Sequence, residues 1–447
     1  MAILRRIGEW FKQAAGKGKS FPEPVVISRS EHTISRGHIS PNAVKVLYRL
    51  KDAGFSAYLV GGGVRDLLLD ADPKDFDIVT DARPEQVRGL FKNCILIGRR
   101  FRLAHVRFRD EIIEVATFRT EAKQNRFSTK QTSMILRDNR YGTIVEDAWR
   151  RDFTVNALYY NIADFSVVDY TGGMADLNAR QLRMIGDPEQ RYREDPVRML
   201  RAIRFAGKLN FSLHEETKAP LIHLSPLLEW VPPARLFEEF LKLFFHGQSK
   251  RTMELLLEYQ QFQFLFPSAF AAMQNNAHAQ KLIDLTLINT DHRINAGKTI
   301  TPAFLIAALL WAPVQQSLRE FRNEGEHVQR ALQLAMEHVL KKQNQHLSLP
   351  RRFTLTTQEI WRLQSRLERR VPFQIMPTLT SSKFRAAYDF LMLRNEAGEN
   401  VQEAAQWWTQ IQSVNEEEQQ AMIDALAKAP RKRSHKRKSS SKANQNP

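Results

Sequence analysis

Residues 58–80 read YLVGGGVRDLLLDADPKDFDIVT, and this stretch decides the architecture of the first part of the chain. An apolar strand is expected to lead into three glycines (Gly61, Gly62 and Gly63), with a short helix from Val64 and a second strand around Phe76. Glycines let backbone N–H groups approach a phosphate closely, and the start of a helix favours its negative charge. The stretch therefore predicts a phosphate-binding turn between two strands.

The second predicted strand carries two carboxylates, Asp75 and Asp77. Because side chains alternate along a strand, both are expected on one face, with Phe76 on the other. Neighbouring carboxylates repel each other unless a cation lies between them, and Mg²⁺, with Mn²⁺ as the alternative, prefers carboxylate and phosphate oxygens. Each half of the motif alone fits a tight turn or a solvated strand end. Together they indicate metal-assisted chemistry on a nucleoside triphosphate, and the absence of a following Gly-Lys-Ser/Thr excludes a P-loop.

The composition indicates a folded protein with a polyanionic partner. The 447 residues, of which 43% are hydrophobic, suffice for two or three domains. No apolar run approaches the length of a membrane span, and the N-terminus lacks the apolar segment of a signal peptide. The single cysteine, Cys94, lies in an apolar neighbourhood and excludes a disulfide framework, so a cytoplasmic location is expected. The net charge of +17 favours binding to nucleic acid.

Part of this charge is concentrated at the C-terminus. Residues 430–447, PRKRSHKRKSSSKANQNP, contain seven Lys or Arg and no acidic residue. Such a segment has too few apolar residues to fold alone, so we expect a disordered, salt-sensitive phosphate binder, with a purely solubilising tail as the alternative. The candidate RNA-binding residues are Arg431, Lys432, Arg433, Lys436, Arg437 and Lys438.

The remaining patterns predict an α+β protein. A helix over 41–53, a helix over 84–91 and three strands within 94–118 surround the glycine motif, and the polar residues 121–133 are expected to form a loop. Helices dominate from Asp147 onward; they are expected over 148–160 and 195–209, and from Pro233, Thr252, Pro302 and Val328. We interpret the tryptophans of this half as packing anchors: Trp311, Trp361, Trp407 and Trp408.

A second cluster of polar residues lies in 147–161, DAWRRDFTVNALYYN. The Arg151 guanidinium is suited to a triphosphate, and Asn156 is a further candidate for nucleotide binding. Asp152 is either a helix-start residue or a third carboxylate that completes a two-metal site. Glu114, in the strand IIEVATF, is the rival candidate for that third carboxylate.

A third cluster, YREDPVRMLRAIRF over 192–205, offers a base-reading pair. Asp195 before Pro196 is typical of a helix start that needs no ligand. Asp195 and Arg198 nevertheless share a helix face, and one acceptor beside one donor matches the Watson–Crick edge of adenine. Cytosine presents the same pattern, whereas guanine and uracil present the reverse. The pair therefore predicts selection of A or C.

These motifs together resemble those of the class II nucleotidyltransferases, which comprise tRNA CCA-adding enzymes and bacterial poly(A) polymerases. The resemblance covers about residues 40–265: LVGGGVRD with DFD resembles the first motif, RRDFTVNAL the second and EDPVRMLRAIRF the nucleotide-selecting motif. LIGRRFRLAHV, residues 96–106, resembles the element that marks the poly(A) polymerase branch. The chain contains no His-Asp dipeptide, the signature of a phosphohydrolase domain that some CCA-adding enzymes carry.

The resemblance implies a polymerase-β-like palm with a small mixed sheet, then an all-helical neck, body and C-terminal region. The expected parts are a basic N-terminal extension (1–40), a catalytic domain (41–170), a neck and body that select the nucleotide and bind RNA (171–265), a helical C-terminal domain (266–429) and a disordered basic tail (430–447). By motif position, it implies metal binding by Asp75 and Asp77, and nucleotide contacts by Gly62, Arg65, Arg151, Asp195 and Arg198.

The implied activity is template-independent addition of AMP from ATP to single-stranded RNA 3′ ends by two-metal catalysis, with release of pyrophosphate. A cytoplasmic monomer is expected, with RNA-decay proteins as partners. Two alternatives stay open: a CCA-adding enzyme that uses CTP as well as ATP, and a non-catalytic RNA-binding protein on the same scaffold. Both carboxylates of DFD are present, which disfavours the second alternative.

Overall fold

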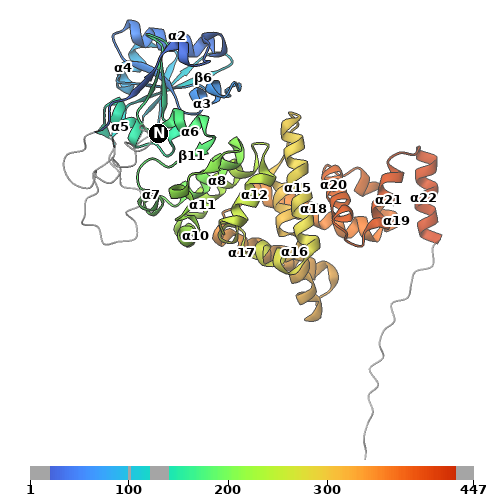
Figure 1. Ribbon diagram of the computed structural model, residues 1–447. Coiled ribbons are helices and arrows are strands. Elements are labelled where there is room, and N and C mark those ends of the chain that lie inside the picture. Colours follow the sequence, from blue (N-terminus) through green and yellow to red (C-terminus); the bar gives the residue numbers. More distant parts are fainter. Residues whose placement is uncertain (1–20, 99–101, 121–139, 429–447) are drawn as a thin grey trace, which may run out of the picture. The chain divides into compact units, whose positions relative to one another are not determined.

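The computed structural model describes residues 21–98, 102–120 and 140–428 (Figure 1). These residues divide into two compact units, one within Met1–Val231 and Arg251–Gln261, the other within Pro232–Lys250 and Phe262–Pro447. The loop expected over 121–133 and the basic tail lie outside the described residues. The α+β class is confirmed, because a mixed sheet precedes a long helical region.

An eight-stranded sheet forms the centre of the first unit, in the order β1-β10-β9-β2-β3-β6-β5-β4. β3 and β6 are parallel, and the other neighbouring strands of this sheet are antiparallel. The strands are β1 (Val25–Ile27), β2 (Ala57–Val60), β3 (Asp77–Thr80), β4 (Cys94–Ile97), β5 (Leu103–Arg107), β6 (Ile112–Thr117), β9 (Leu158–Asn161) and β10 (Val167–Asp169). The three strands expected within 94–118 are thus confirmed.

One face of this sheet is covered by two helices, α2 (Pro41–Asp52) and α4 (Pro84–Leu90), which contact each other (Figure 1). α2 begins where the Ser40 hydroxyl accepts hydrogen bonds from the first turn, and it ends before Gly54, whose φ is +86°. Side chains that alternate along the strands therefore point either into this apolar layer or toward the opposite face. The opposite face carries the polar residues described below.

The prediction of a helix over residues 148–160 is wrong. α5 (Ile144–Trp149) ends early, a 3₁₀ turn covers Thr154–Asn156, and the remaining residues form strand β9. Tyr159 and Tyr160 are both completely buried in β9, between β2 and β10. A short apolar run buried on both sides fits a strand as well as a helix, so its spacing alone did not distinguish the two.

The N-terminal segment also contributes to the sheet. β1 pairs with β10 in antiparallel register, with Val26 opposite Val168. The sheet therefore begins before residue 41, the point at which the sequence placed the start of the catalytic domain. Two small ladders complete the first unit: β7 (Arg119–Thr120) with β8 (Arg140–Tyr141), and β11 (Gln181–Leu182) with β12 (Ser212–Leu213).

Helices make up the rest of the described chain, and those expected from 195, 233, 252, 302 and 328 are confirmed to within three residues. They are α6 (Gly173–Asn178), α7 (Pro188–Glu194), α8 (Val197–Leu209), α9 (Glu215–Lys218), α10 (Leu221–Leu224), α11 (Pro233–Phe244), α12 (Ser249–Glu258), α13 (Phe262–Leu265), α14 (Pro267–Asn275), α15 (Ala277–Asn295), α16 (Pro302–Asn323), α17 (Val328–His346), α18 (Arg351–Arg369), α19 (Pro372–Leu379), α20 (Phe384–Glu396), α21 (Gln402–Ile411) and α22 (Glu416–Lys428). None of these helices is both long and apolar enough to cross a lipid bilayer.

The tryptophans of the second unit are packing anchors, as expected. Trp311, Trp361 and Trp408 are buried, and Trp407 is partly buried against the core cluster that contains Trp408. The indole N–H of Trp361 donates to the Ala307 carbonyl at 3.1 Å, which satisfies the polar atom of a completely buried ring. Cys94 is likewise buried, in β4, with a free thiol.

Candidate active site

The glycine turn brings two functional groups together. Gly61 adopts φ +76°, a conformation that glycine tolerates and other residues resist, and α3 (Gly62–Leu68) begins directly after it. A Cβ atom at Gly61 would lie 3.7 Å from Nη1 of Arg151 and 3.9 Å from Oδ2 of Asp77. The turn, a guanidinium and a carboxylate thus meet at the end of β2.

Asp77 is the first residue of β3, and Asp75 precedes the strand rather than lying within it. The strand therefore begins two residues later than expected, but Asp75 and Asp77 are both exposed and Phe76 between them is buried, which agrees with the expected alternation. Across the parallel pair, Asp77 lies opposite Glu114 of β6, on the solvent-open face. The next row, Ile78 opposite Val115, is buried under the helices. The structure therefore places Glu114 beside Asp77.

The charges around Asp77 are unbalanced. Partial withdrawal from solvent and the nearby carboxylates Glu114 and Asp75 raise the pKa of Asp77, whereas Arg151 lowers it. The raised pKa means that a negative charge at this position is disfavoured until something positive compensates for it. A cation that approaches the open face would supply that compensation.

The donor set suits a hard divalent cation such as Mg²⁺. The described residues hold no preformed group of three or more His, Cys, Asp or Glu side chains arranged around a metal position. Mg²⁺ does not need one, because it commonly takes one or two carboxylates and completes its shell with water and substrate phosphates. The chemistry of Asp75, Asp77 and Glu114 therefore fits a metal that binds together with a triphosphate.

Arg151 is held in place by two buried groups. Its Nε donates to the Tyr159 hydroxyl at 3.0 Å, and its Nη2 donates to Oδ2 of Asp147 at 3.1 Å. The Tyr159 hydroxyl also donates to Asp147 at 2.8 Å, and Asp147 is completely buried. Burial would raise the pKa of Asp147, but Arg151 and Arg150 outweigh it and lower that pKa. Asp147 is thus an ionised anchor for a guanidinium that faces the glycine turn.

Arg65, a predicted nucleotide contact, lies below the turn rather than in the open site. It is 2% exposed, and its Nε and Nη2 donate to Asp66 at 2.8 and 2.5 Å. Its Nη1 donates to the amide oxygen of Asn156 at 2.6 Å. A Cβ at Gly62 would lie 3.5 Å from Nη2 of Arg65. Arg65 and Asn156, both predicted nucleotide contacts, therefore join α3 to the turn that follows Arg151.

Asp152 belongs to a different cluster. Its Oδ2 accepts from Nε of Arg201 at 2.6 Å, and its Oδ1 accepts from Nε of Arg198 at 3.3 Å. Burial would raise the pKa of Asp152, but Arg201, Arg198 and Arg191 outweigh it and lower the pKa. A carboxylate neutralised by guanidinium groups offers little to a metal ion. This arrangement favours Glu114 over Asp152 as the third carboxylate.

The predicted base-reading pair lies at the junction of α7 and α8. Asp195 ends α7, Pro196 precedes α8, and Oδ1 of Asp195 accepts from the Val197 N–H at 3.3 Å. The assignment of Asp195 and Pro196 as N-cap and N1 is therefore wrong by one residue, because Pro196 is the N-cap of α8 and Asp195 is the C-cap of α7. The Asp195 carboxylate nevertheless binds the N–H of the first residue of α8. Arg198 is 8% exposed and donates from Nη1 to Glu194 at 3.0 Å. Its guanidinium is therefore oriented by Asp152 and Glu194.

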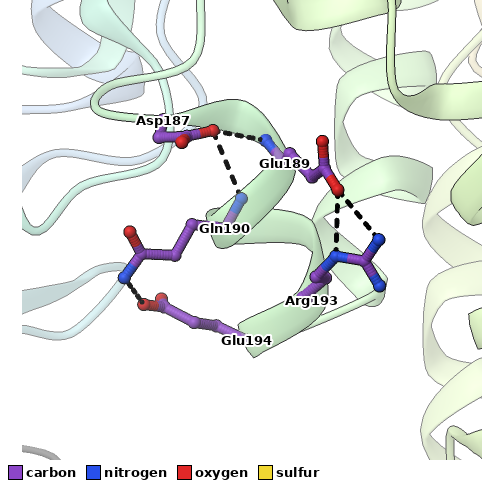
Figure 2. A pocket seen from close by; sticks show the side chains of 5 residues that line it. All are labelled: Asp187, Glu189, Gln190, Arg193 and Glu194. Carbon is purple, nitrogen blue, oxygen red and sulfur yellow. Dashed lines mark hydrogen bonds and ion pairs between the residues drawn. The ribbon is translucent and has the colours of Figure 1, made fainter.

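A pocket of about 440 Å³ lies alongside α7 (Figure 2). Five residues line it: Asp187, Glu189, Gln190, Arg193 and Glu194. Figure 2 shows that these side chains and backbone groups bind one another, for example Arg193 to Glu189 at 2.8 Å. Neither Asp75 nor Asp77 lines this pocket, whose lining residue Glu194 accepts a hydrogen bond from Arg198.

Two residues of the site were not identified from the sequence alone. Asp147 stands in the quoted cluster, but nothing in its spacing shows that it is buried under Arg151. His105 stands in the segment LIGRRFRLAHV, and its Nε2 lies 3.3 Å from Oε1 of Glu114. The alternation of β5 against β6 would place the two side chains on one face, but only the register pairs them.

Comparison with known proteins identifies the family. Three family models match the chain. The Poly A polymerase head domain matches residues 57–183, and a probable RNA and SrmB-binding site of polymerase A matches residues 210–273. The polymerase A arginine-rich C-terminus matches residues 324–442. Poly(A) polymerase I of Salmonella typhimurium is 49% identical over 93% of this chain and 92% of its own length. The chain belongs to the poly(A) polymerase family.

Other comparisons agree with this membership. Poly(A) polymerase I of Haemophilus influenzae is 46% identical over 89% of this chain and 90% of its own length. A CCA-adding enzyme of Lactobacillus helveticus is 39% identical, but over only 49% of this chain and 53% of its own length. As a member of the poly(A) polymerase family, the protein is a nucleotidyltransferase of the polynucleotide adenylyltransferase class.

The fold is shared with solved CCA-adding enzymes. The Bacillus stearothermophilus enzyme in complex with CTP aligns with a TM-score of 0.51 at 24% identity, over 86% of this chain and 81% of its own. The Thermotoga maritima enzyme complexed with tRNA aligns with a TM-score of 0.54 at 19% identity, over 90% and 85%. At this identity the likeness concerns the fold of the class II nucleotidyltransferases, to which the poly(A) polymerase family belongs.

Proposed function

We propose that the protein adds AMP from ATP to the 3′ ends of RNA at the open face of the palm sheet, with Asp75, Asp77 and Glu114 as its carboxylates. The observation that carries this proposal is the meeting of Gly61, Asp77 and Arg151 at the end of β2, with Glu114 opposite Asp77. Family membership supports the reaction class, and this geometry supports the proposed location of the site. The RNA 3′-hydroxyl attacks the α-phosphate of ATP, and pyrophosphate leaves.

The three carboxylates would hold Mg²⁺ together with the triphosphate, and Mn²⁺ has the same oxygen preference. Bound Mg²⁺ would neutralise the triphosphate and lower the pKa of the attacking hydroxyl. The positions of the three carboxylates determine where the positive charge of the metal would lie. Asp77, whose ionised form is disfavoured without a cation, couples metal binding to the arrival of ATP.

Glu114, rather than Asp152, completes this set. Glu114 lies opposite Asp77 in the parallel register, whereas Asp152 accepts from Arg198 and Arg201. The role of Asp152 is instead to hold those guanidinium groups. Glu114→Gln and Asp152→Asn form a matched pair of isosteric substitutions. Glu114→Gln is expected to remove AMP transfer, and Asp152→Asn is expected to change nucleotide selection while transfer persists.

The triphosphate lies over the glycine turn. The backbone N–H groups of Gly61 and Gly62 point toward its oxygens, and the anchored Arg151 guanidinium neutralises part of its charge. Arg65 and Asn156, predicted from sequence as direct contacts, support the turn from below through their 2.6 Å hydrogen bond. The contribution of Arg65 and Asn156 is therefore to keep α3 and Arg151 in the positions from which they bind the nucleotide.

The base lies toward the start of α8. Asp195 accepts from the adenine amino group, and Arg198 donates to the adjacent ring nitrogen. Arg198 is pre-oriented by Asp152 and Glu194, so it does not need to be reordered when ATP binds. This donor and acceptor pair excludes guanine and uracil.

The RNA is held mainly through its phosphates. The net charge of +17 and the basic tail bind single-stranded RNA through its phosphates, in a salt-sensitive way and without sequence preference. The basic tail residues are Arg431, Lys432, Arg433, Lys436, Arg437 and Lys438. We further propose that the protein acts as a monomer in the cytoplasm, in RNA processing and decay together with RNA-decay proteins.

Primer extension tests the proposal. Purified protein, Mg²⁺ and each nucleotide separately are offered labelled single-stranded RNA and tRNA that lacks its 3′ end. A long ladder with ATP alone on both RNAs is expected. Addition of a few nucleotides that requires CTP and is confined to tRNA would instead indicate CCA addition. No extension of either RNA by the wild-type protein would refute the transferase activity.

A further inference from the structure

Three polar side chains lie in one row across three neighbouring strands. Asp77 of β3 pairs with Glu114 of β6, and Glu114 pairs in turn with His105 of β5. The adjacent row, Ile78, Val115 and Ala104, is buried on the helix-covered side. The polar row therefore lies on the open face, with Glu114 between Asp77 and His105.

His105 and Glu114 are in contact. Nε2 of His105 lies 3.3 Å from Oε1 of Glu114. The His105 side chain is 16% exposed and that of Glu114 is 48% exposed. On its other side His105 has an apolar neighbour, Ile95 of β4. In this row, the imidazole therefore has one polar partner, the Glu114 carboxylate.

We propose that His105 is a positioning residue for Glu114, an inference that rests on the proposed role of Glu114 as third carboxylate. The Nε2 side of the His105 ring restrains the Glu114 carboxylate through Oε1, and the other oxygen would then be free to bind a metal ion. A half-exposed glutamate has several rotamers, and repulsion from Asp77 favours those that turn away from the site. The restrained imidazole limits Glu114 to a rotamer that stays in the polar row.

Hydrogen bonds to metal-binding carboxylates have a measurable effect. Loss of such an outer partner typically reduces metal affinity or activity by about 10- to 100-fold. Because His105 does not touch the nucleotide in this arrangement, its removal should reduce kcat and metal affinity more than it raises the KM for ATP.

The test compares four variants with the wild type: His105→Leu, His105→Gln, Glu114→Gln and the double variant His105→Leu/Glu114→Gln. Leucine removes the donor, whereas the glutamine amide retains an N–H. His38→Leu, at an exposed histidine of a 3₁₀ turn (Arg36–His38), is the matched control. Two quantities are measured on each protein: kcat and KM for ATP, and the affinity for Mn²⁺ by calorimetry in the presence of a non-hydrolysable ATP analogue.

We expect His105→Leu to lower kcat and Mn²⁺ affinity by about tenfold or more, and His105→Gln to recover at least half of the loss on a logarithmic scale. In the Glu114→Gln background, the histidine substitution should weaken Mn²⁺ binding no further. Wild-type kcat and Mn²⁺ affinity of His105→Leu would overturn the role of His105 and leave that of Glu114 untouched. An equally large further loss of Mn²⁺ affinity on adding His105→Leu to Glu114→Gln would have the same meaning. Full activity of Glu114→Gln would instead overturn the role of Glu114 itself.

Discussion

Asp77 and Glu114 lie directly opposite each other on the neighbouring parallel strands β3 and β6, and both are exposed on the face opposite α2 and α4. Partial withdrawal from solvent and the neighbouring carboxylates Glu114 and Asp75 raise the pKa of Asp77, so a charge at this position is costly for the protein without ligand. The same arrangement becomes favourable when a cation and a triphosphate arrive. Stability and activity should therefore respond in opposite directions to changes at this pair.

Asp77→Asn should abolish AMP transfer and raise the thermal stability of the metal-free protein at pH 7. The folded protein holds a proton on Asp77 more strongly than the unfolded chain does, so ionisation destabilises the fold as pH rises through the raised pKa. The neutral amide removes this effect. Calorimetric melting without divalent metal, alongside primer extension, measures both quantities.

RNA affinity serves as the control for that variant. Asp77→Asn, and likewise Asp75→Ala, should bind single-stranded RNA nearly as tightly as the wild type, because the carboxylates do not contact the RNA phosphates. An equal loss of RNA binding and activity would show that these residues are structural. A lower melting temperature for Asp77→Asn would contradict the charge argument.

Asp147→Asn should destabilise the protein by about 3 kcal/mol, because it leaves two guanidinium groups, Arg150 and Arg151, beside a buried neutral amide. The pKa of Asp147 is lowered in the fold, so its contribution is present at neutral pH and is lost as pH falls through that lowered pKa. The free energy of unfolding in urea, measured from pH 7 downward, should therefore converge for variant and wild type in acid. Asp52→Asn, at the exposed end of α2, is the control, and a difference that stays constant with pH would refute the ion-pair explanation.

Asp195→Asn should alter nucleotide choice. The amide oxygen can still accept from the Val197 N–H, so α8 is preserved, but the base now meets a side chain that can also donate. We expect kcat/KM for ATP to fall by about 10- to 100-fold and discrimination against GTP to narrow, in line with about 1–3 kcal/mol for a base-reading pair. Asp187→Asn, at the N-cap of α7, where the carboxylate also accepts from backbone N–H groups at a helix start, is the control. Unchanged ATP-to-GTP ratios would show that Asp195 only caps the helix.

Removal of residues 430–447 should weaken RNA binding and flatten its dependence on salt. Each phosphate contact contributes about 0.7 to the slope of log K against log salt for single strands, so seven lost cations change it by at most about 5. Filter binding at several salt concentrations provides the slope. A tail of equal length with glutamine in place of lysine and arginine separates charge from length. A slope equal to that of the intact protein would refute phosphate binding by the tail.

Local sequence was sufficient for the motifs and for most elements. The glycine turn at Gly61, the helix α2 with its Ser40 cap and Gly54 end, and the hairpin of β5 and β6 each follow from short-range chemistry. The spacing of apolar residues did not give the correct secondary structure where a buried apolar run is compatible with both a helix and a strand. Tyr159 and Tyr160 belong to a strand because β2 and β10 flank it, and neither partner is local in sequence.

The sequence by itself determined which chemical groups the protein carries: two carboxylates after a glycine turn, a guanidinium pair, and an acceptor beside a donor at the start of α8. Only the tertiary structure decided which of these groups meet. The parallel register of β3 and β6 placed Glu114 beside Asp77, and the approach of α8 to Asp152 neutralised the rival carboxylate with Arg198 and Arg201. The reason is physical: the ionisation and availability of a carboxylate depend on the charges within a few ångströms of it, and here those charges come from distant parts of the chain.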